Sequence, residues 1–141
     1  MRTSSRLLTG LLALGVFIYC GCGMSRGVDQ AKKAVDEFHT RFNAKPFDAI
    51  FDDADPEWRK SMDRDTSDKF FARVQRKMGG CSASTNGGYN YNVTTSGTFV
   101  TIDYQTSCAN GKLEEQFRWR MDGKKTLLLA YNANNSLLLT D

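Results

Sequence analysis

The sequence has few of the residues that usually build catalytic and metal centres, with one histidine, His39, and four cysteines among 141 residues. A single histidine cannot form a zinc site with a second one. Phosphate-binding loops, Gly-x-Ser-x-Gly elbows and Cys–His pairs of known spacing are absent. The acidic residues between positions 48 and 57 lack the glycine and the spacing of a calcium loop. We therefore expect no metal and no cofactor, and we expect His39 to lie at the core boundary or in solvent.

A strong excess of charge of either sign is also missing. The whole sequence has 19 basic and 16 acidic residues, and Arg2 and Arg6 belong to the leader described below. Without them, 17 basic residues face 16 acidic ones, and no run of Lys or Arg is longer than two. A nearly neutral domain has no global field that would attract a polyanion. Nucleic acid is therefore disfavoured as a partner.

The longest apolar run, residues 7–19, is short for a membrane span. Two arginines precede it, and small residues and cysteines follow it, which is the layout of a secretory signal. We predict that residues 1–21 form a cleaved lipoprotein signal peptide, that residues 22–27 form a tether, and that residues 28–141 form a single domain.

The end of this leader resembles the lipobox of bacterial lipoproteins, in which a small residue precedes the cysteine that is lipidated. Gly21 stands before Cys22, whereas the bulky Tyr19 stands before Cys20. The resemblance implies that Cys22 carries the lipid (palmitate), with Cys20 as the alternative. It also implies a bacterial envelope protein that is anchored to a membrane and faces the periplasm or the exterior. Ordinary signal-peptidase cleavage, or an uncleaved membrane anchor, are the competing interpretations, but no Ala-x-Ala site is present.

The two remaining cysteines, Cys81 and Cys108, are predicted to form a disulfide, because an exported protein meets an oxidising compartment. They are nearly equidistant from an expected turn at residues 94–97. Antiparallel pairing of the flanking segments would place the two cysteines opposite each other.

Apolar residues at three- and four-residue steps indicate helices in the first half of the chain. Asp55-Pro56-Glu57 is a strong helix start, because aspartate caps the first turn and proline suits its first position. Gly79-Gly80 ends the last helix. The expected helices span residues 28–42, 46–51, 55–62 and 65–78.

The second half of the chain has alternating patterns that are typical of strands. Asn110-Gly111 and Asp122-Gly123 are strong hairpin turns. The expected strands span residues 81–85 and 89–94, interrupted by a glycine pair, then 98–107, 113–121 and 125–131, followed by a tail at 132–141.

Helices followed by an antiparallel meander predict an α+β fold in which N-terminal helices pack on a curved four-stranded antiparallel sheet. The element order, the Phe47–Phe51 turn, the Asp55-Pro56-Glu57-Trp58 start and the closing hairpin at Asp122-Gly123 resemble the cystatin-like, nuclear-transport-factor-2-like group. The resemblance covers residues 28–132 and implies a cone-shaped fold.

Enzymes of that group, such as ketosteroid isomerases, work from the mouth of the cone with an aspartate base and a tyrosine donor. That set does not carry over, because Asp103 and Tyr104 are neighbours on one strand and point to opposite faces.

The candidate pocket residues are Tyr104, Glu115, Phe117 and Trp119. Glu115, Phe117 and Trp119 share one face of a strand, so Glu115 could be a buried carboxylate that lines a pocket. The interpretation we favour leaves Glu115 in water at the end of its strand, near Asn110-Gly111. For the aromatic side chains we likewise favour a filled core over an open cavity.

The sequence predicts no specific activity. Our main hypothesis is a lipid-anchored envelope protein with a non-catalytic binding or interaction domain, which contacts another envelope protein or a small apolar ligand. The alternatives are a small pocket enzyme of the isomerase or lyase type, and a structural accessory subunit without a pocket. Acids or tyrosines that converge inside an open cavity would favour the enzyme.

Overall fold

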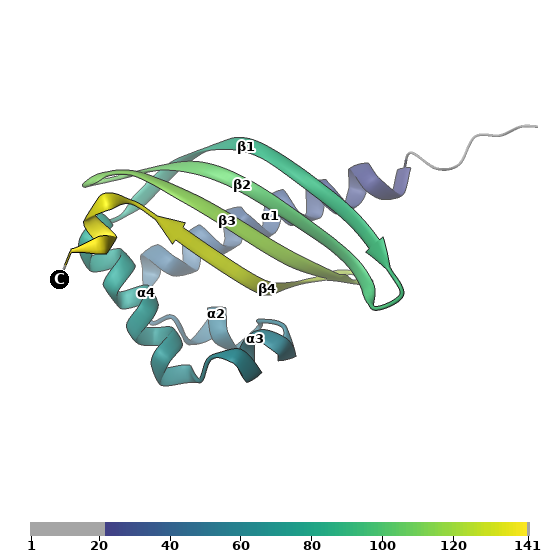
Figure 1. Ribbon diagram of the computed structural model, residues 1–141, viewed down its shortest axis with the longest axis horizontal. Helices are drawn as coiled ribbons and strands as arrows, with labels where there is room; N and C mark the ends of the chain where they lie inside the picture. Colours follow the sequence, from purple (N-terminus) through teal and green to yellow (C-terminus); the bar gives the residue numbers. More distant parts are fainter. Residues whose placement is uncertain (1–21, 141) are drawn as a thin grey trace, which may run out of the picture.

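The computed structural model describes residues 22–140, in which four helices precede four strands (Figure 1). The predicted leader, including Cys20, lies outside the described residues. In chain order the elements are α1 (Cys22–Ala44), α2 (Asp48–Asp52), α3 (Pro56–Ser61), α4 (Arg64–Met78), β1 (Cys81–Thr94), β2 (Gly97–Cys108), β3 (Gly111–Asp122), β4 (Lys125–Asn134) and the 3-10 helix η1 (Ser136–Leu139).

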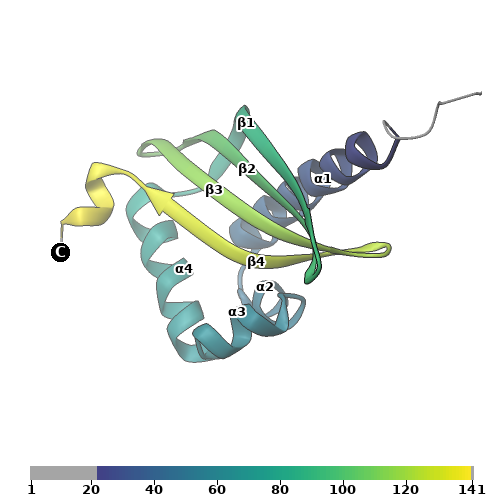
Figure 2. The same cartoon turned by 45° about the vertical axis from the view of Figure 1, so that its right-hand side comes forward.

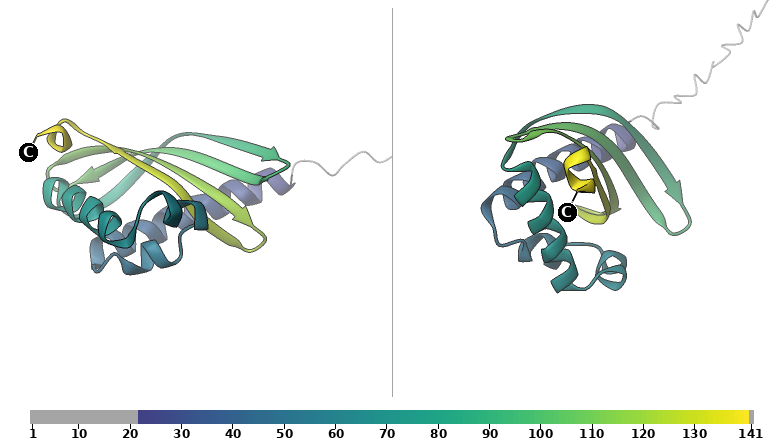
Figure 3. Two further views of the ribbon diagram at one scale, coloured as in Figure 1. Left: turned by 60° about the horizontal axis from the view of Figure 1, so that its bottom comes forward. Right: turned by 60° about the vertical axis from the view of Figure 1, so that its left-hand side comes forward.

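The four strands form one antiparallel sheet in the order β1-β2-β3-β4. The sheet curves over the helices, and α1 runs along its inner side (Figure 3). The short helices α2 and α3 lie below the β3–β4 side of the sheet, and α4 returns toward the start of β1 (Figure 2). The predicted α+β architecture, with helices on one face of a four-stranded antiparallel sheet, is confirmed. None of the described helices is long and apolar enough to cross a membrane.

Helix α1 begins at Cys22, six residues before the predicted start, so residues 22–27 are helical where we expected a tether. The reason is tertiary packing at Gly27, which the sequence pattern did not show. Gly27 is buried, and a Cβ atom at this position would lie 2.8 Å from Cε2 of Tyr91 on β1. The helix therefore continues toward its N-terminus because the first hairpin packs closely on it.

The predicted start of α3 is confirmed. The Asp55 carboxylate accepts a hydrogen bond from the backbone N–H of Glu57 at 2.9 Å. The backbone N–H of Asp55 also donates to the carbonyl of Leu128 on β4 at 2.9 Å. The cap therefore ties the α2–α3 segment to the edge of the sheet.

Helix α4 starts at Arg64, slightly earlier than predicted, because Asp63 caps it by accepting from the N–H of Thr66 at 2.7 Å. The expected stop at Gly79-Gly80 is confirmed. Gly79 has φ +74°, and a Cβ atom there would lie 2.7 Å from Cβ of Ala109. A side chain at this position would therefore be strained and would clash.

The first strand is longer than predicted. β1 runs unbroken through Asn86-Gly87-Gly88, where a register shift takes up the glycine pair as a bulge. The expected tail is also structured, because β4 continues to Asn134 and η1 follows it. The longer β1 and β4 arise from pairing with a neighbouring strand, which short-range sequence patterns do not show, and η1 is capped by the Asn135 side chain.

The core between sheet and helices is filled by aromatic side chains. Phe38 on α1 lies with its ring centroid 5.0 Å from Phe117 on β3 and 4.9 Å from Tyr131 on β4. Phe71 on α4 packs against Phe38 and Tyr131 at 5.7 and 5.8 Å. The aromatic residues therefore pack on one another, as the filled-core interpretation expected.

The predicted disulfide joins Cys81 and Cys108, which are paired across β1 and β2. It closes a loop over a sequence separation of 27 residues. Loop-closure entropy gives such a bond about 2–4 kcal/mol of stabilisation. Next to it, Asn43 at the end of α1 bonds both backbone groups of Cys81, at 2.6 and 3.1 Å.

Candidate functional site

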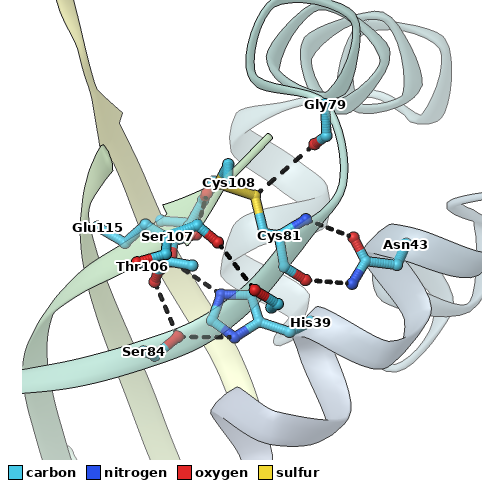
Figure 4. Close-up of polar contacts among 11 residues, drawn as sticks. His39, Asn43, Gly79, Cys81, Ser84, Thr106, Ser107, Cys108 and Glu115 are labelled. Atoms are coloured by element: carbon cyan, nitrogen blue, oxygen red, sulfur yellow. Dashed lines mark hydrogen bonds and ion pairs between the residues drawn. A yellow bond between two sulfur atoms is a disulfide. The ribbon is translucent and has the colours of Figure 1, made fainter. Parts of the chain in front are cut away.

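A buried polar cluster lies between α1 and the inner face of the sheet (Figure 4). We call it the Glu115 cluster, and its members are His39, Ser84, Thr106, Glu115 and Tyr131. Helix α1 and each of the four strands contribute one residue.

The strand register brings four of these residues together. Ser84 on β1 is paired with Thr106 on β2, and Glu115 on β3 is paired with Tyr104, two residues before Thr106. Tyr131 on β4 is paired with Phe117, two residues after Glu115. Side chains two positions apart along paired strands lie on the same face, so the set converges on the inner side.

Both carboxylate oxygens of Glu115 are occupied. Oε1 accepts a hydrogen bond from the Tyr131 hydroxyl at 2.6 Å. Oε2 accepts from the Thr106 hydroxyl at 2.5 Å and contacts Nε2 of His39 at 2.8 Å. The Glu115 side chain is only 2% exposed, so these three donors replace the water that a carboxylate normally binds.

Ser84 closes the cluster into a ring. Its hydroxyl lies 2.9 Å from Oγ1 of Thr106 and 3.4 Å from Nδ1 of His39. Because the single hydroxyl proton of Thr106 is directed to Glu115, Ser84 is the donor to Thr106. Nε2 of His39 therefore faces Glu115, and its Nδ1 faces the hydroxyl of Ser84.

Burial raises the pKa of Tyr131 well above its usual value of 10, and the nearby Glu115 carboxylate raises it further. Both effects disfavour a tyrosinate, because the charged form would lose its water and would face a second negative charge. Tyr131 is therefore a fixed proton donor to Glu115 across the neutral pH range.

A cavity lies elsewhere, between α1, the α2–α3 segment and the β3–β4 hairpin. Its volume is about 630 Å³. Apolar side chains line part of it, among them Phe38, Ile50, Trp119 and Leu128. Charged side chains complete the lining: Lys33, Glu37, Arg41, Asp52, Asp53, Arg59, Asp122, Lys124 and Lys125.

A second hollow, of about 410 Å³, is lined by polar side chains of β2, β3 and β4. Gln116 and Asn132, which are both exposed, contribute to it, together with Tyr104 and Glu115. The four candidate pocket residues are therefore divided. Trp119 lines the large cavity, Tyr104 and Glu115 line the small hollow, and Phe117 is fully buried in the core.

Two of our expectations are corrected here. Glu115 is buried, although we favoured a solvated side chain, and His39 is only 8% exposed. The sequence contained a signal for Glu115, which alternates with the buried Leu113 and Phe117 and so lies on the core face. A charge on that face requires partners. We missed those partners because Ser84 stands in a polar strand segment, and because Thr106, which continues the face of Val100 and Ile102, carries no charge that would mark it as a partner.

No metal-binding group of three or more acidic, histidine or cysteine residues occurs within residues 22–140. The comparisons with known proteins add no assignment: no protein-family model matches the chain, and no curated protein matches it. The class that the fold and the site define is therefore an α+β domain with a filled aromatic core, a saturated buried carboxylate and a separate cavity at its rim.

Replacing Glu115 by leucine should destabilise the domain by about 3–5 kcal/mol, because three buried donors lose their shared acceptor. The matched control is Glu114→Leu, an exposed neighbour on the opposite face, which should change the free energy of unfolding by no more than about 0.5 kcal/mol. Urea denaturation measures both. Equal effects of the two substitutions would show that the cluster is not structural.

Tyr131→Phe should cost about 1–3 kcal/mol at neutral pH, because Oε1 of Glu115 loses its hydroxyl donor. In the wild type, stability should fall above about pH 10, because the unfolded tyrosine ionises there while folded Tyr131 keeps its proton. This decline, up to about 1.4 kcal/mol per pH unit, should be reduced in the variant. Tyr89→Phe, at an exposed site, should leave the alkaline slope unchanged, and an unchanged slope in Tyr131→Phe would contradict the assignment.

Proposed function

We propose that the chain is a lipid-anchored bacterial envelope protein whose folded domain is a non-catalytic binding or interaction domain. The anchor is the lipidated Cys22, and the domain faces the periplasm or the exterior. The observation that carries the binding role is the 630 Å³ cavity, with its apolar lining and its charged rim. A small, partly apolar ligand, or an apolar segment of another envelope protein, fits this combination.

The curved sheet over a long first helix also supports a cystatin-like cone, which we propose as the fold family of the domain. In such a cone the covered inner face is the natural place for a ligand. In this chain the deep part of that space is occupied by Phe38, Phe71 and Phe117. The binding region that remains is the cavity at the rim.

The structure of the Glu115 cluster favours a binding protein over a pocket enzyme. Glu115 and Tyr131 do converge, but each oxygen of Glu115 already has a protein donor and its side chain is 2% exposed. Ser84, His39 and Glu115 also follow the connectivity of a serine-hydrolase triad. However, Ser84 is also bonded to Thr106, and neither of the two cavities includes Ser84 or His39.

Lipid anchoring predicts that a Cys22→Ser variant, expressed from the full-length sequence in a bacterium, moves from the membrane to the soluble fraction. Cys20→Ser is the matched control and should stay membrane-bound. Fractionation followed by mass spectrometry of the mature N-terminus measures both effects. Release of Cys20→Ser with retention of Cys22→Ser would assign the lipid to Cys20.

The cavity predicts that a fluorescent apolar anion, such as 1-anilinonaphthalene-8-sulfonate, binds the folded domain and changes the emission of Trp119. Ala34→Phe places a ring in the cavity lining and should weaken this binding by about tenfold or more, equivalent to about 1.4 kcal/mol. Gln116→Leu, in the second hollow, should leave the affinity unchanged. Equal affinities for the wild type and Ala34→Phe would exclude the cavity as the site.

A further inference from the structure

The apolar stripe of α1 extends beyond the covered core. Val28, Ala31 and Val35 lie on one face of the helix and are at most 4% exposed. Met24 lies one turn before Val28 on that stripe, yet it is 47% exposed. At its first turn, the core-facing side of the helix is therefore left partly exposed by the other segments within residues 22–140.

The β1–β2 hairpin also has side chains that lie on its core-facing side and are nevertheless exposed. Tyr91 packs against Gly27, so its side chain faces α1. Val93, two residues further along β1, lies on the same face because no register shift separates the two positions. Val93 is nevertheless 64% exposed, and Tyr89 on the same face is 54% exposed.

These side chains gather at one end of the molecule. The start of α1 and the turns of the β1–β2 and β3–β4 hairpins lie at this end, and the C-terminus lies at the other (Figures 1 and 2). Cys22 is the first residue of α1, two residues before Met24. At 1.5 Å per residue along the helix, a lipid on Cys22 is attached about 3 Å from Met24 along the axis. No flexible linker separates the anchor from this end.

The charges at this end are nearly balanced. Arg26, Lys124 and Lys125 stand against Asp29 and Asp122, and all five are exposed. Electrostatic attraction to anionic lipids is therefore weak, and apolar contact dominates.

We propose that this end, built from Met24, Val93 and the two hairpin turns, docks on the surface of the bilayer that holds the lipid of Cys22, with Met24 and Val93 entering the interface. The inference rests on the proposed anchoring at Cys22. It adds that the domain lies against the membrane in a fixed orientation, with its C-terminus pointing away.

The test uses the mature lipidated protein, purified from bacterial membranes in detergent and reconstituted in phosphatidylcholine vesicles that contain brominated acyl chains. Two variants carry an additional tryptophan, Val93→Trp at the docking end and Leu139→Trp at the opposite end, both at exposed positions. The native Trp58 and Trp119 are buried and supply a common background. Val93→Trp should lose additional emission through bromine quenching and shift to shorter wavelength, whereas Leu139→Trp should do neither. Adding phosphatidylglycerol should change this result little.

The outcomes separate the two proposals. A mature protein that does not float with the vesicles overturns both the anchoring at Cys22 and the docking. Flotation with equal or no additional quenching in the two variants overturns the docking alone. A blue shift of Val93→Trp in detergent that increases with protein concentration assigns the surface to a second copy of the chain, and also overturns the docking on lipid.

Discussion

The structure depends on one requirement, that the buried carboxylate of Glu115 has a donor for each of its oxygens. Three donors come from α1, β2 and β4, and Ser84 on β1 completes the ring. A one-residue slip of β2 or β4 would turn Thr106 or Tyr131 to the outer face and remove a hydrogen-bond donor from the buried carboxylate. The cluster thus fixes the register of the whole sheet relative to the first helix, which an apolar core alone specifies less strictly.

The aromatic core supplies the apolar contacts between the sheet and the helices, which the polar Glu115 cluster does not provide. Phe38, Phe71, Phe117 and Tyr131 pack in edge and tilted contacts between the layers, and all four belong to the buried apolar core. Tyr131 belongs to both systems, because its ring is in the core and its hydroxyl is bonded to Glu115. Tyr131 therefore joins the polar cluster directly to the aromatic core.

Local sequence patterns predicted the order of the elements, the Asp55 cap, the end of α4 at Gly79 and the Cys81–Cys108 pair. The cap and the helix end follow from a residue and its nearest neighbours, such as a capping oxygen or a glycine that permits positive φ. The cysteine pair follows from its even spacing about the turn at residues 94–97. The errors concern contacts between distant segments. Helix α1 extends through Gly27 because Tyr91 packs on this glycine. Strand β1 continues through Gly87-Gly88 because the residues before and after this glycine pair are both paired with β2.

Glu115 shows most clearly where sequence interpretation stops. Its alternation with Leu113 and Phe117 placed it on the core face, but its position near the turn favoured solvent. Its burial depends on donors from distant segments, among them His39, which is 76 residues away in the sequence. A lone histidine beside an apolar helix stripe carries no sign that a carboxylate faces it, so only the docking of α1 on the sheet reveals the pair.

The disulfide and the hydrogen bonds between distant segments are distributed unevenly between the two ends of the molecule. The disulfide, the Asn43 bonds to Cys81, the Asn110 bonds to the end of α4 and the Glu115 cluster all lie toward the end that holds the β2–β3 turn. The opposite end has two hairpin turns, the large cavity and the exposed apolar side chains of Met24 and Val93. Segments with fewer buried contacts and covalent bonds unfold locally at a lower free-energy cost, and binding surfaces commonly belong to such segments. The proposed binding cavity and the proposed docking surface therefore both lie at the end with fewer of these contacts, which is the end where α1 begins at Cys22.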